Sequence, residues 1–461
     1  MIPLKISDIA QIVGGVIEGE LNPELVVTQF PVIDSRIASK ENFFVAFSGE
    51  NVDGHSFVNA ALAAGSPFAL VSTSVGASSI RVDDVVIALS HLAHYVRRQL
   101  PELKVVGITG SQGKTTTKDL LGHILMTAGE TVIPEGSLNN EIGVPLTLLR
   151  ATPQTRFCIL EMGARHKGDI AHLVKISEPN VGAVLVVGSA HIGEFGSRQD
   201  IAETKGEMVA ELAPGAIAVL GSYDEFTPKM FTPAGVERVL FGESASCDVR
   251  AADIEFREGR AHFDLVTPAG RESVGLQLLG LHQVANALGA AAIATALHIP
   301  IESIAAALST AEPTSKWRME LHQAGEVALI NDSYNANPES MAAALRTLVL
   351  IAQERGGSSW AILGRMHELG DSQALEHEEI GRLAANLGVD HLVAIGCDEY
   401  LTAVRGHSDM TVHTCANFDE AMKLSQNIIA GDVVLVKASR AEKLNDLADS
   451  LLDSFASREL Q

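Results

Sequence analysis

The segment KVVGITGSQGKTTT, residues 104–117, constrains the fold of this chain more than any other part of the sequence. The apolar run Val105–Ile108 predicts a short buried strand, and the residues from Lys114 onward are compatible with a helix. The segment also contains three glycines, Gly107, Gly110 and Gly113. A strand, a glycine-rich turn and a helix in this order predict an α/β unit that binds a phosphate group at the helix N-terminus.

The turn has the features of a nucleotide phosphate loop. Lys114 is placed to reach the β and γ phosphates of ATP, and Thr115 to bind Mg²⁺. We expect nucleotide contacts from Gly110, Ser111, Gly113, Lys114, Thr115 and Thr116. The strict pattern G-x-x-x-x-G-K-[ST] has glycine where Ile108 stands, and a glycine-rich turn with an incidental lysine is the alternative interpretation. The loop does not name a reaction, because kinases, motors, switches and ligases all use such loops.

Length and charge exclude some classes of function. A chain of 461 residues favours two to four domains. The chain contains 34 basic and 57 acidic residues, which gives a net charge of −23. Such a chain lacks the basic footprint of sequence-independent nucleic-acid binding, so we expect no nucleic-acid partner.

Cysteines and termini predict a cytoplasmic protein. The four cysteines are widely spaced and form no C-x-x-C pair, which argues against a disulfide framework and against a zinc site. The opening MIPLKISDIA has no basic region followed by a long apolar run, so it does not read as a secretion signal. The longest stretch of small apolar residues, 287–297, is too short to cross a bilayer, and we expect no integral membrane association.

The chain divides into three predicted blocks, residues 1–85, 86–311 and 312–461. In the first block, short apolar runs alternate with turns, which predicts strands at 43–47 and 68–71 with a helix over 58–64. The second block is predicted to have helices at 91–99, 284–297 and 301–308, and strands at 105–108, 156–163 and 181–188. The third is predicted to have strands at 327–331, 360–364, 391–396 and 432–439. Alternating strands and helices predict an α/β protein, with doubly wound parallel sheets in a central ATP-binding block and a Rossmann-like C-terminal block, after a small α/β N-terminal block.

Three polar residues follow the strands of the second block. Glu161 ends one strand, at the sheet edge where ligands bind, and is either a Mg²⁺ ligand or a solvent-exposed carboxylate. His191 follows the next strand; because magnesium prefers oxygen, a polar loop histidine is the better interpretation from chemistry alone. Lys205 lies in an amphipathic helical segment, where a lysine is usually solvated.

Further polar clusters carry binding or capping residues. Asn139 and Asn140 precede a helix and serve either as ligands of a sugar or phosphate or as helix caps. His282 and Asn286 are four residues apart on one helical face, where the amide matches the edge of adenine. The segment NDSYNANPES, 331–340, is the densest polar cluster, and its alternative interpretation is a turn with capping residues.

Taken together, these segments resemble the Mur ligase family over essentially the whole chain. The matching segments are 34–57, GITGSQGKTTTKD, NNEIGVPLTLL, LEMGARHKGDI, AHIGEFGS followed by AETKGE, NDSYNANPES and the LG-x-M-x-ELG of 363–370. The last two are the most specific and indicate the member that adds a dipeptide. The resemblance implies an ATP-dependent acid–amino acid ligase of peptidoglycan synthesis that joins UDP-MurNAc-tripeptide to D-Ala-D-Ala through an acyl phosphate. We expect the protein to be a monomer.

The resemblance also implies roles for single residues. It implies that Thr115, Glu161, His191 and a carbamylated Lys205 hold Mg²⁺, and that Lys114, Lys205, His191 and Arg318 are catalytic. Asn286, Arg318 and Asp332 would contact adenine, phosphate and ribose. The substrate-binding residues would be Ser35 and Arg36, at the UDP end, with Asn139, Asn140, Tyr334, Asn335 and Asn337.

Some positions depart from the family, and rival functions remain. The departures are Gln283, Arg365, the pair Arg165 and His166, and Ala438 within the family's K-G-S-R. The rivals are a sibling Mur ligase or a folylpolyglutamate-type ligase that adds one amino acid, a phosphate-loop ATPase switch, and a non-catalytic scaffold.

Overall fold

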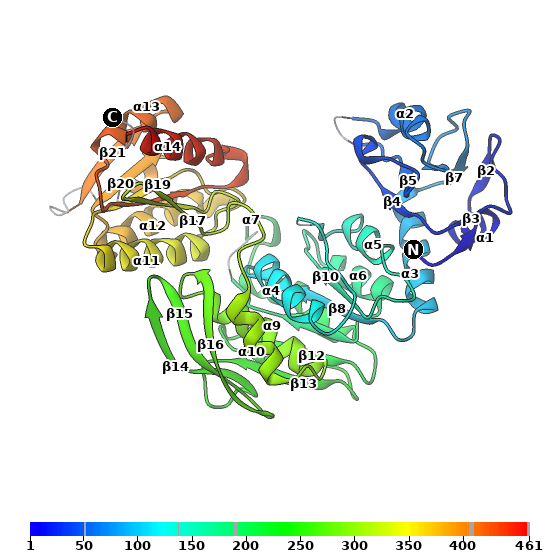
Figure 1. Cartoon of the computed structure of the whole chain (residues 1–461), viewed down its shortest axis with the longest axis horizontal. Coiled ribbons are helices and arrows are strands. Elements are labelled where there is room, and N and C mark those ends of the chain that lie inside the picture. Colours follow the sequence, from blue (N-terminus) through cyan, green and yellow to red (C-terminus); the bar gives the residue numbers. More distant parts are fainter. Residues whose placement is uncertain (50–51, 137, 189–191, 403, 405–409, 459–461) are drawn as a thin grey trace.

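The computed structural model describes residues 1–49, 52–136, 138–188, 192–402, 404 and 410–458. Three α/β units are arranged in a row, with the N-terminal and C-terminal units on opposite sides of the central one (Figure 1). The α/β class is confirmed, whereas the proposed unit boundaries after residues 85 and 311 stay predictions. Within the described part of the chain, no helix has both the length and the apolar character needed to cross a membrane.

The N-terminal unit is built on a five-stranded sheet in the order β2-β7-β6-β5-β4. Strands β4 to β7 are parallel, and β2 is an antiparallel edge. Its elements are β1 (Leu4–Lys5), α1 (Ile6–Val13), β2 (Val16–Glu18), β3 (Val26–Val27), β4 (Phe30–Val32), β5 (Asn42–Val45), α2 (Val58–Ala63), β6 (Ala69–Val71) and β7 (Ser79–Arg81). The predicted strands and helix of this block are therefore confirmed as β5, α2 and β6.

The central sheet has nine strands in the order β16-β15-β14-β13-β12-β11-β8-β10-β9. From β9 to β14 all neighbours are parallel, and β15 and β16 add an antiparallel edge. The strands are β8 (Lys104–Thr109), β9 (Thr131–Val132), β10 (Phe157–Glu161), β11 (Val181–Val184), β12 (Ile217–Gly221), β13 (Glu237–Gly242), β14 (Val249–Arg257), β15 (Arg260–Thr267) and β16 (Gly270–Leu279). Sequence reasoning found β8, β10 and β11 but missed β9 and β12 to β16. In β14 and β15 the side chains alternate between more buried and more exposed positions.

Helices cover both faces of the central sheet and leave one apolar core on each. One face carries α4 (Lys114–Met126), α9 (Gln283–Ala296) and α10 (Ile301–Thr310). The other face carries α5 (Gly143–Leu148), α6 (Asp169–Ser177) and α8 (Arg198–Ala210), and the short α7 (Ile192–Phe195) precedes α8. The prediction of a doubly wound sheet is confirmed for this unit.

Helix α3 joins the first two units. It spans Val85–Gln99 rather than the predicted His91–Gln99, because Asp84 accepts hydrogen bonds from the backbone N–H groups of Val86 and Ile87 and caps the helix earlier. The helix packs against α1 on one side and against α5 and α6 on the other. A single apolar core therefore runs from the N-terminal unit into the central one.

The C-terminal unit has a six-stranded sheet in the order β17-β18-β22-β19-β20-β21, parallel except for β17. Its strands are β17 (Glu320–Ala324), β18 (Val327–Asn331), β19 (Ser359–Leu363), β20 (His391–Ile395), β21 (Thr411–Cys415) and β22 (Val433–Lys437). Helices α11 (Pro338–Arg355) and α12 (Gln373–Leu387) cover one face, and α13 (Phe418–Leu424) and α14 (Asn445–Arg458) cover the other. The four predicted strands are confirmed, and β17 and β21 are additions. Helix α11 lies next to the β14–β16 edge of the central unit (Figure 1), where Leu279 joins the core of the C-terminal unit.

Candidate active site

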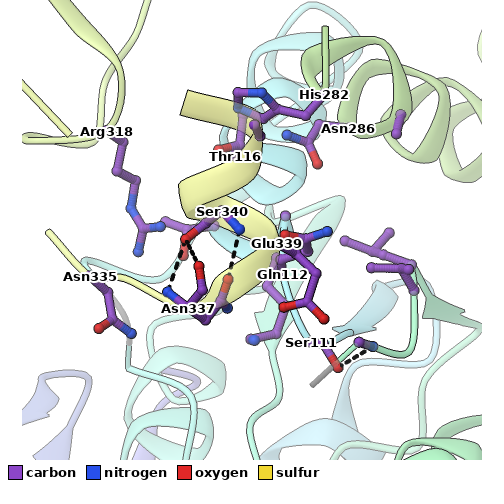
Figure 2. A pocket seen from close by; sticks show the side chains of 18 of the residues that line it. Ser111, Gln112, Thr116, His282, Asn286, Arg318, Asn335, Asn337, Glu339 and Ser340 are labelled. Carbon is purple, nitrogen blue, oxygen red and sulfur yellow. Dashed lines mark hydrogen bonds between the residues drawn. The ribbon is translucent and has the colours of Figure 1, made fainter. Parts of the chain in front are cut away.

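A cavity of about 750 Å³ lies between the central and C-terminal units. Its walls come from the phosphate loop, the start of α9, the linker before β17 and the start of α11 (Figure 2). The end of β10 also lines it. Thirteen of the predicted site residues line it: Ser111, Gly113, Lys114, Thr115, Thr116, Asn139, Glu161, Asn286, Arg318, Asp332, Tyr334, Asn335 and Asn337. Residues more than 200 positions apart in the chain thus meet in one cavity.

The phosphate loop is held against the end of β11. The backbone N–H of Ser111 donates to the carbonyl of Val186 at 2.9 Å, and the N–H of Gly188 donates to Ser111 Oγ at 2.8 Å. Gly113 has a φ of 81°, which favours glycine, and a Cβ there would lie 2.3 Å from the amide oxygen of Asn286. The loop is therefore anchored to the segment that follows β11, and α9 packs closely against Gly113.

Lys114 folds back over this loop. Its Nζ donates to the carbonyl of Gly110 at 2.7 Å. Burial lowers the pKa of Lys114, the charge of Glu161 opposes that shift, and the charge of Arg318 adds to it. Two cationic side chains from different units therefore converge where a phosphate anion would bind.

Thr115, Glu161 and Asn139 form a hydrogen-bonded group at the ends of β8 and β10. Thr115 Oγ1 donates to Glu161 Oε2, and Asn139 Nδ2 donates to Glu161 Oε1, each at 2.9 Å. Glu161 is only 1% exposed, so the interpretation of a solvent-exposed carboxylate is wrong. Among the described residues no group of three or more His, Cys, Asp or Glu side chains is placed to hold a metal, yet the hydroxyl and carboxylate oxygens of this group are the donors that Mg²⁺ prefers.

Asn140 takes the alternative role that its sequence allowed. Its Oδ1 accepts a hydrogen bond of 3.0 Å from the N–H of Gly143 at the start of α5. The side chain is exposed and lies outside the cavity lining. The adjacent amides therefore differ in function: Asn139 orients Glu161, and Asn140 caps a helix.

Lys205 is buried on α8, with 4% of its surface exposed. Burial, together with the charge of Lys114, lowers its pKa to about 7. The expectation of a solvated lysine from chemistry alone is therefore wrong. His191, which was predicted beside it, lies outside the described residues.

The start of α9 forms another wall of the cavity. Asn286 Nδ2 donates to Gln283 Oε1 at 2.8 Å, so the glutamine that departs from the family pattern orients the predicted adenine ligand. His282 Nδ1 is buried and has no hydrogen-bond partner in the described part of the chain, and burial lowers the pKa of His282 to about 4. Its imidazole is therefore neutral near pH 7 and free to hydrogen-bond a ligand.

The C-terminal unit contributes a cation and a buried ion pair. The guanidinium of Arg318 lies over the ring of Tyr334, 4.0 Å from its centroid. Asp332 Oδ2 is 2.6 Å from Lys437 Nζ, and Asp332 Oδ1 accepts from the backbone N–H of Met319 at 3.1 Å. Sequence reasoning did not assign Lys437 to the site, although it is the lysine of the K-G-S-R-like segment.

Asn335 and Asn337 line the cavity but use their side-chain oxygens locally. Asn337 caps α11: its Oδ1 accepts from the N–H of Ser340 at 2.8 Å, and Ser340 Oγ accepts from the N–H of Asn337 at 3.1 Å (Figure 2). Asn335 Oδ1 accepts from the N–H of Ala336 at 2.9 Å. In both side chains the NH₂ group is the part that remains for a ligand.

The predicted UDP-binding residues lie apart from this cavity, in the N-terminal unit. Ser35 and Arg36 are in a single 3₁₀ turn after β4. Arg36 is exposed and pairs with Asp34 at 2.7 Å, and this guanidinium holds the pKa of Asp34 at about 2. They do not line the cavity around the phosphate loop.

Comparison with known proteins shows which family has a similar sequence. Residues 108–294 match the model of the Mur ligase middle domain, and residues 317–440 match the Mur ligase, glutamate ligase domain. The UDP-N-acetylmuramoyl-tripeptide–D-alanyl-D-alanine ligase of Mycobacterium bovis is 38% identical, over 98% of both chains. This chain belongs to the Mur ligase family.

Solved structures of Mur ligases have the same three-unit fold. A crystal structure of MurF from Acinetobacter baumannii superimposes with a TM-score of 0.88 at 34% identity, covering 98% of this chain and 99% of that one. MurF from Thermotoga maritima, solved in complex with ADP, gives a TM-score of 0.79 at 28% identity, covering 94% and 99%. The likeness thus includes all three units, and one of the similar Mur ligases was solved with an adenine nucleotide.

Proposed function

We propose that this Mur ligase joins D-alanyl-D-alanine to UDP-N-acetylmuramoyl-tripeptide with ATP and Mg²⁺, which makes UDP-N-acetylmuramoyl-pentapeptide for peptidoglycan. The observation that carries the proposal is the likeness to ligases of this name over 98% of both chains. The site supports it, because a phosphate loop, a buried carboxylate and a cation from the next unit face one cavity.

The chemistry follows from the weakness of a carboxylate as an acyl donor. Attack of the tripeptide carboxylate on the γ-phosphorus of ATP forms an acyl phosphate and releases ADP. The amine of D-Ala-D-Ala then attacks the acyl carbon, and phosphate leaves. Lys114 and Arg318 are placed to neutralise the charge that moves during phosphoryl transfer.

Thr115 and Glu161 are the residues that would hold Mg²⁺, with Asn139 fixing the carboxylate. The ion supplies charge neutralisation between the phosphates and the incoming carboxylate. Thr115 lies in the first turn of α4, so the same helix start would offer both its N–H groups and this hydroxyl to the ligand.

Carbamylation of Lys205 is part of the proposal. Only the unprotonated amine attacks CO₂: an N–C bond forms, one C=O π bond of CO₂ breaks and its electrons go to oxygen, and the nitrogen releases one proton. A neutral amine thus becomes an anionic oxygen ligand. The low pKa of about 7 supports carbamylation, because at pH 7 Lys205 is then unprotonated in about half of the molecules. A carbamate there would also remove the repulsion between Lys205 and Lys114.

We also propose that Ser35 and Arg36 hold the UDP end of the substrate, and that the enzyme acts as a cytoplasmic monomer. The separation of the N-terminal unit from the cavity supports the first point, since a UDP-linked peptide is long. Size-exclusion chromatography with light scattering tests the second: a mass near 48.8 kDa is expected for the monomer.

The decisive experiment is phosphate release from ATP with UDP-MurNAc-tripeptide, with and without D-Ala-D-Ala, followed by mass spectrometry. Release that requires both substrates and yields the pentapeptide mass is the expected result. Replacing the dipeptide with single amino acids tests the sibling and folylpolyglutamate-type alternatives. Release without either substrate and without a new amide would support an ATPase switch instead.

A further inference from the structure

Lys437 lines the cavity from the end of β22 and, like Glu161, has only 1% of its surface exposed. Its Nζ donates to Asp332 Oδ2 at 2.6 Å and to the carbonyl of Asn335 at 2.9 Å. It therefore ties the end of one strand to the loop that follows its neighbour, β18. A lysine so enclosed by acceptors from the protein is poorly placed to serve as a ligand itself.

Asp332 connects Lys437 to the linker between the central and C-terminal units. While Oδ2 binds Lys437, Oδ1 accepts from the N–H of Met319, the residue after Arg318. The N–H of Tyr334 also donates to the carbonyl of Trp317, the residue before Arg318, at 3.0 Å. Both neighbours of Arg318 are thus attached to the loop that Lys437 holds.

The backbone on either side of Arg318 has an unfavourable conformation that hydrogen bonds to neighbouring residues must stabilise. Trp317 has a φ of 60° and Met319 a φ of 52°, a left-handed conformation that is unfavourable for bulky side chains. Backbone strain of this kind persists where surrounding contacts hold it, and the bond from Met319 to Asp332 is one of those contacts. The conformation turns Arg318 into the cavity and onto Tyr334.

We propose that Lys437 is a positioning residue for the nucleotide. It fixes the Asp332 carboxylate in the orientation that receives the ribose hydroxyls and, through Asp332, fixes the backbone of Arg318. This inference rests on the proposed function, because it takes the ribose of the bound ATP to lie at Asp332, which lines the cavity. Without Lys437 the carboxylate is a buried charge without its counter-ion, which favours reorientation toward water.

The test measures nucleotide binding and needs no turnover. Dissociation constants for ATP and for 2′,3′-dideoxy-ATP are determined by calorimetry on the full chain, for the wild type, Lys437→Met and Asp332→Asn. We expect the wild type to prefer ATP by about tenfold, the scale of one or two hydrogen bonds to a charged group. We expect this preference to fall toward one in both variants. A folded Lys437→Met protein that keeps the wild-type preference overturns the proposal, as does a wild type with no preference.

A double variant keeps the proposal testable if Lys437→Met does not fold. Asp332→Asn with Lys437→Met removes both buried charges and leaves no uncompensated ion. If Lys437 acts through Asp332, the double variant binds ATP as Asp332→Asn does. Additional weakening would mean that Lys437 contacts the nucleotide directly, and would overturn the positioning role.

Asp432→Asn is the matched control. Asp432 is 3% exposed in the same unit and accepts hydrogen bonds from Trp360 Nε1 and from the N–H groups of Ser358 and Ile429, each at 3.0 Å. It is outside the cavity lining, so we expect a lower Tm with the wild-type preference for ATP. If the wild type makes no pentapeptide while the binding pattern holds, the proposed function fails and the positioning role stands.

Discussion

Thr115 Oγ1 and Glu161 Oε2 are hydrogen-bonded at 2.9 Å, and this contact joins the helix after the phosphate loop to the end of the neighbouring strand β10. The pair is buried, and Asn139 holds the second carboxylate oxygen. Two oxygen donors are therefore fixed beside the phosphate loop before any ligand arrives, which is the preorganisation that a Mg²⁺–ATP site requires.

Asn139→Ala is expected to weaken Mg²⁺ binding, although Asn139 is not itself a proposed ligand of the metal. The carboxylate of Glu161 loses the amide that orients it, and such partners typically contribute about 10–100-fold in metal affinity. Ligation rates measured across a Mg²⁺ titration should show half-maximal activity at a higher Mg²⁺ concentration. Asn140→Ala, which removes a helix cap outside the cavity, is the control, and an unchanged Mg²⁺ dependence in Asn139→Ala would contradict the assignment.

Gly113→Ala is expected to abolish ATP binding. The new Cβ would meet the Asn286 amide at 2.3 Å and would need a φ of 81°. Gly388→Ala separates the steric contact from the backbone strain. Gly388 has a similar φ of 79°, but no atom lies within 4 Å of the added carbon. That control should lose about 1–2 kcal/mol of stability and bind ATP normally by calorimetry. Equal ATP affinities in the two variants would show that the close approach to α9 is unimportant.

Arg318→Lys is expected to lower kcat by about 10³-fold or more, because a lysine loses both the guanidinium geometry and the stack on Tyr334. The KM for D-Ala-D-Ala should change little. Steady-state kinetics with each substrate varied in turn test this, and Arg382→Lys on the surface of α12 is the control. A rise in KM with unchanged kcat would assign Arg318 to ground-state binding alone.

Lys205 is expected to make stability depend on pH in the unmodified chain. Its pKa is lowered from 10.5 to about 7 by folding, so between these values the unfolded state binds more protons than the folded state. Stability relative to Lys205→Met should therefore rise with pH from about 7 toward 10.5, and the deficit should be greatest below pH 7. Denaturant unfolding in CO₂-free buffer measures the difference, and a flat profile would contradict the burial of the amine. Lys175→Met, an exposed lysine, should show no such dependence.

Carbamylation of Lys205 has its own measurement. With ¹³C-bicarbonate, the folded wild type should show a carbamate signal that increases as the pH rises through about 7. Lys205→Met should lack the signal, whereas Lys175→Met should retain it. Loss of the signal in both variants, or its absence from the wild type, would remove the carbamate from the proposed metal site.

The local elements and the family follow from the sequence alone. Alternating apolar runs and glycine turns predicted β8, β10, β11, four strands of the C-terminal sheet and the α/β class, because burial on both faces leaves continuous apolar stretches. The order of the motifs along the chain indicates the Mur ligase family. The strands β14–β16 were missed because their partly exposed faces interrupt that pattern with charged side chains.

Burial and pairing were decided by the tertiary structure. No local pattern separates Glu161 in solvent from Glu161 held by Thr115 and Asn139, since its partners come from other elements. The same holds for Lys205, whose surroundings lower its pKa, and for Lys437, whose partner Asp332 is 105 residues away. Spacing along a chain reports the periodicity of one helix or strand, whereas the charge state and orientation of a side chain depend on which elements pack around it.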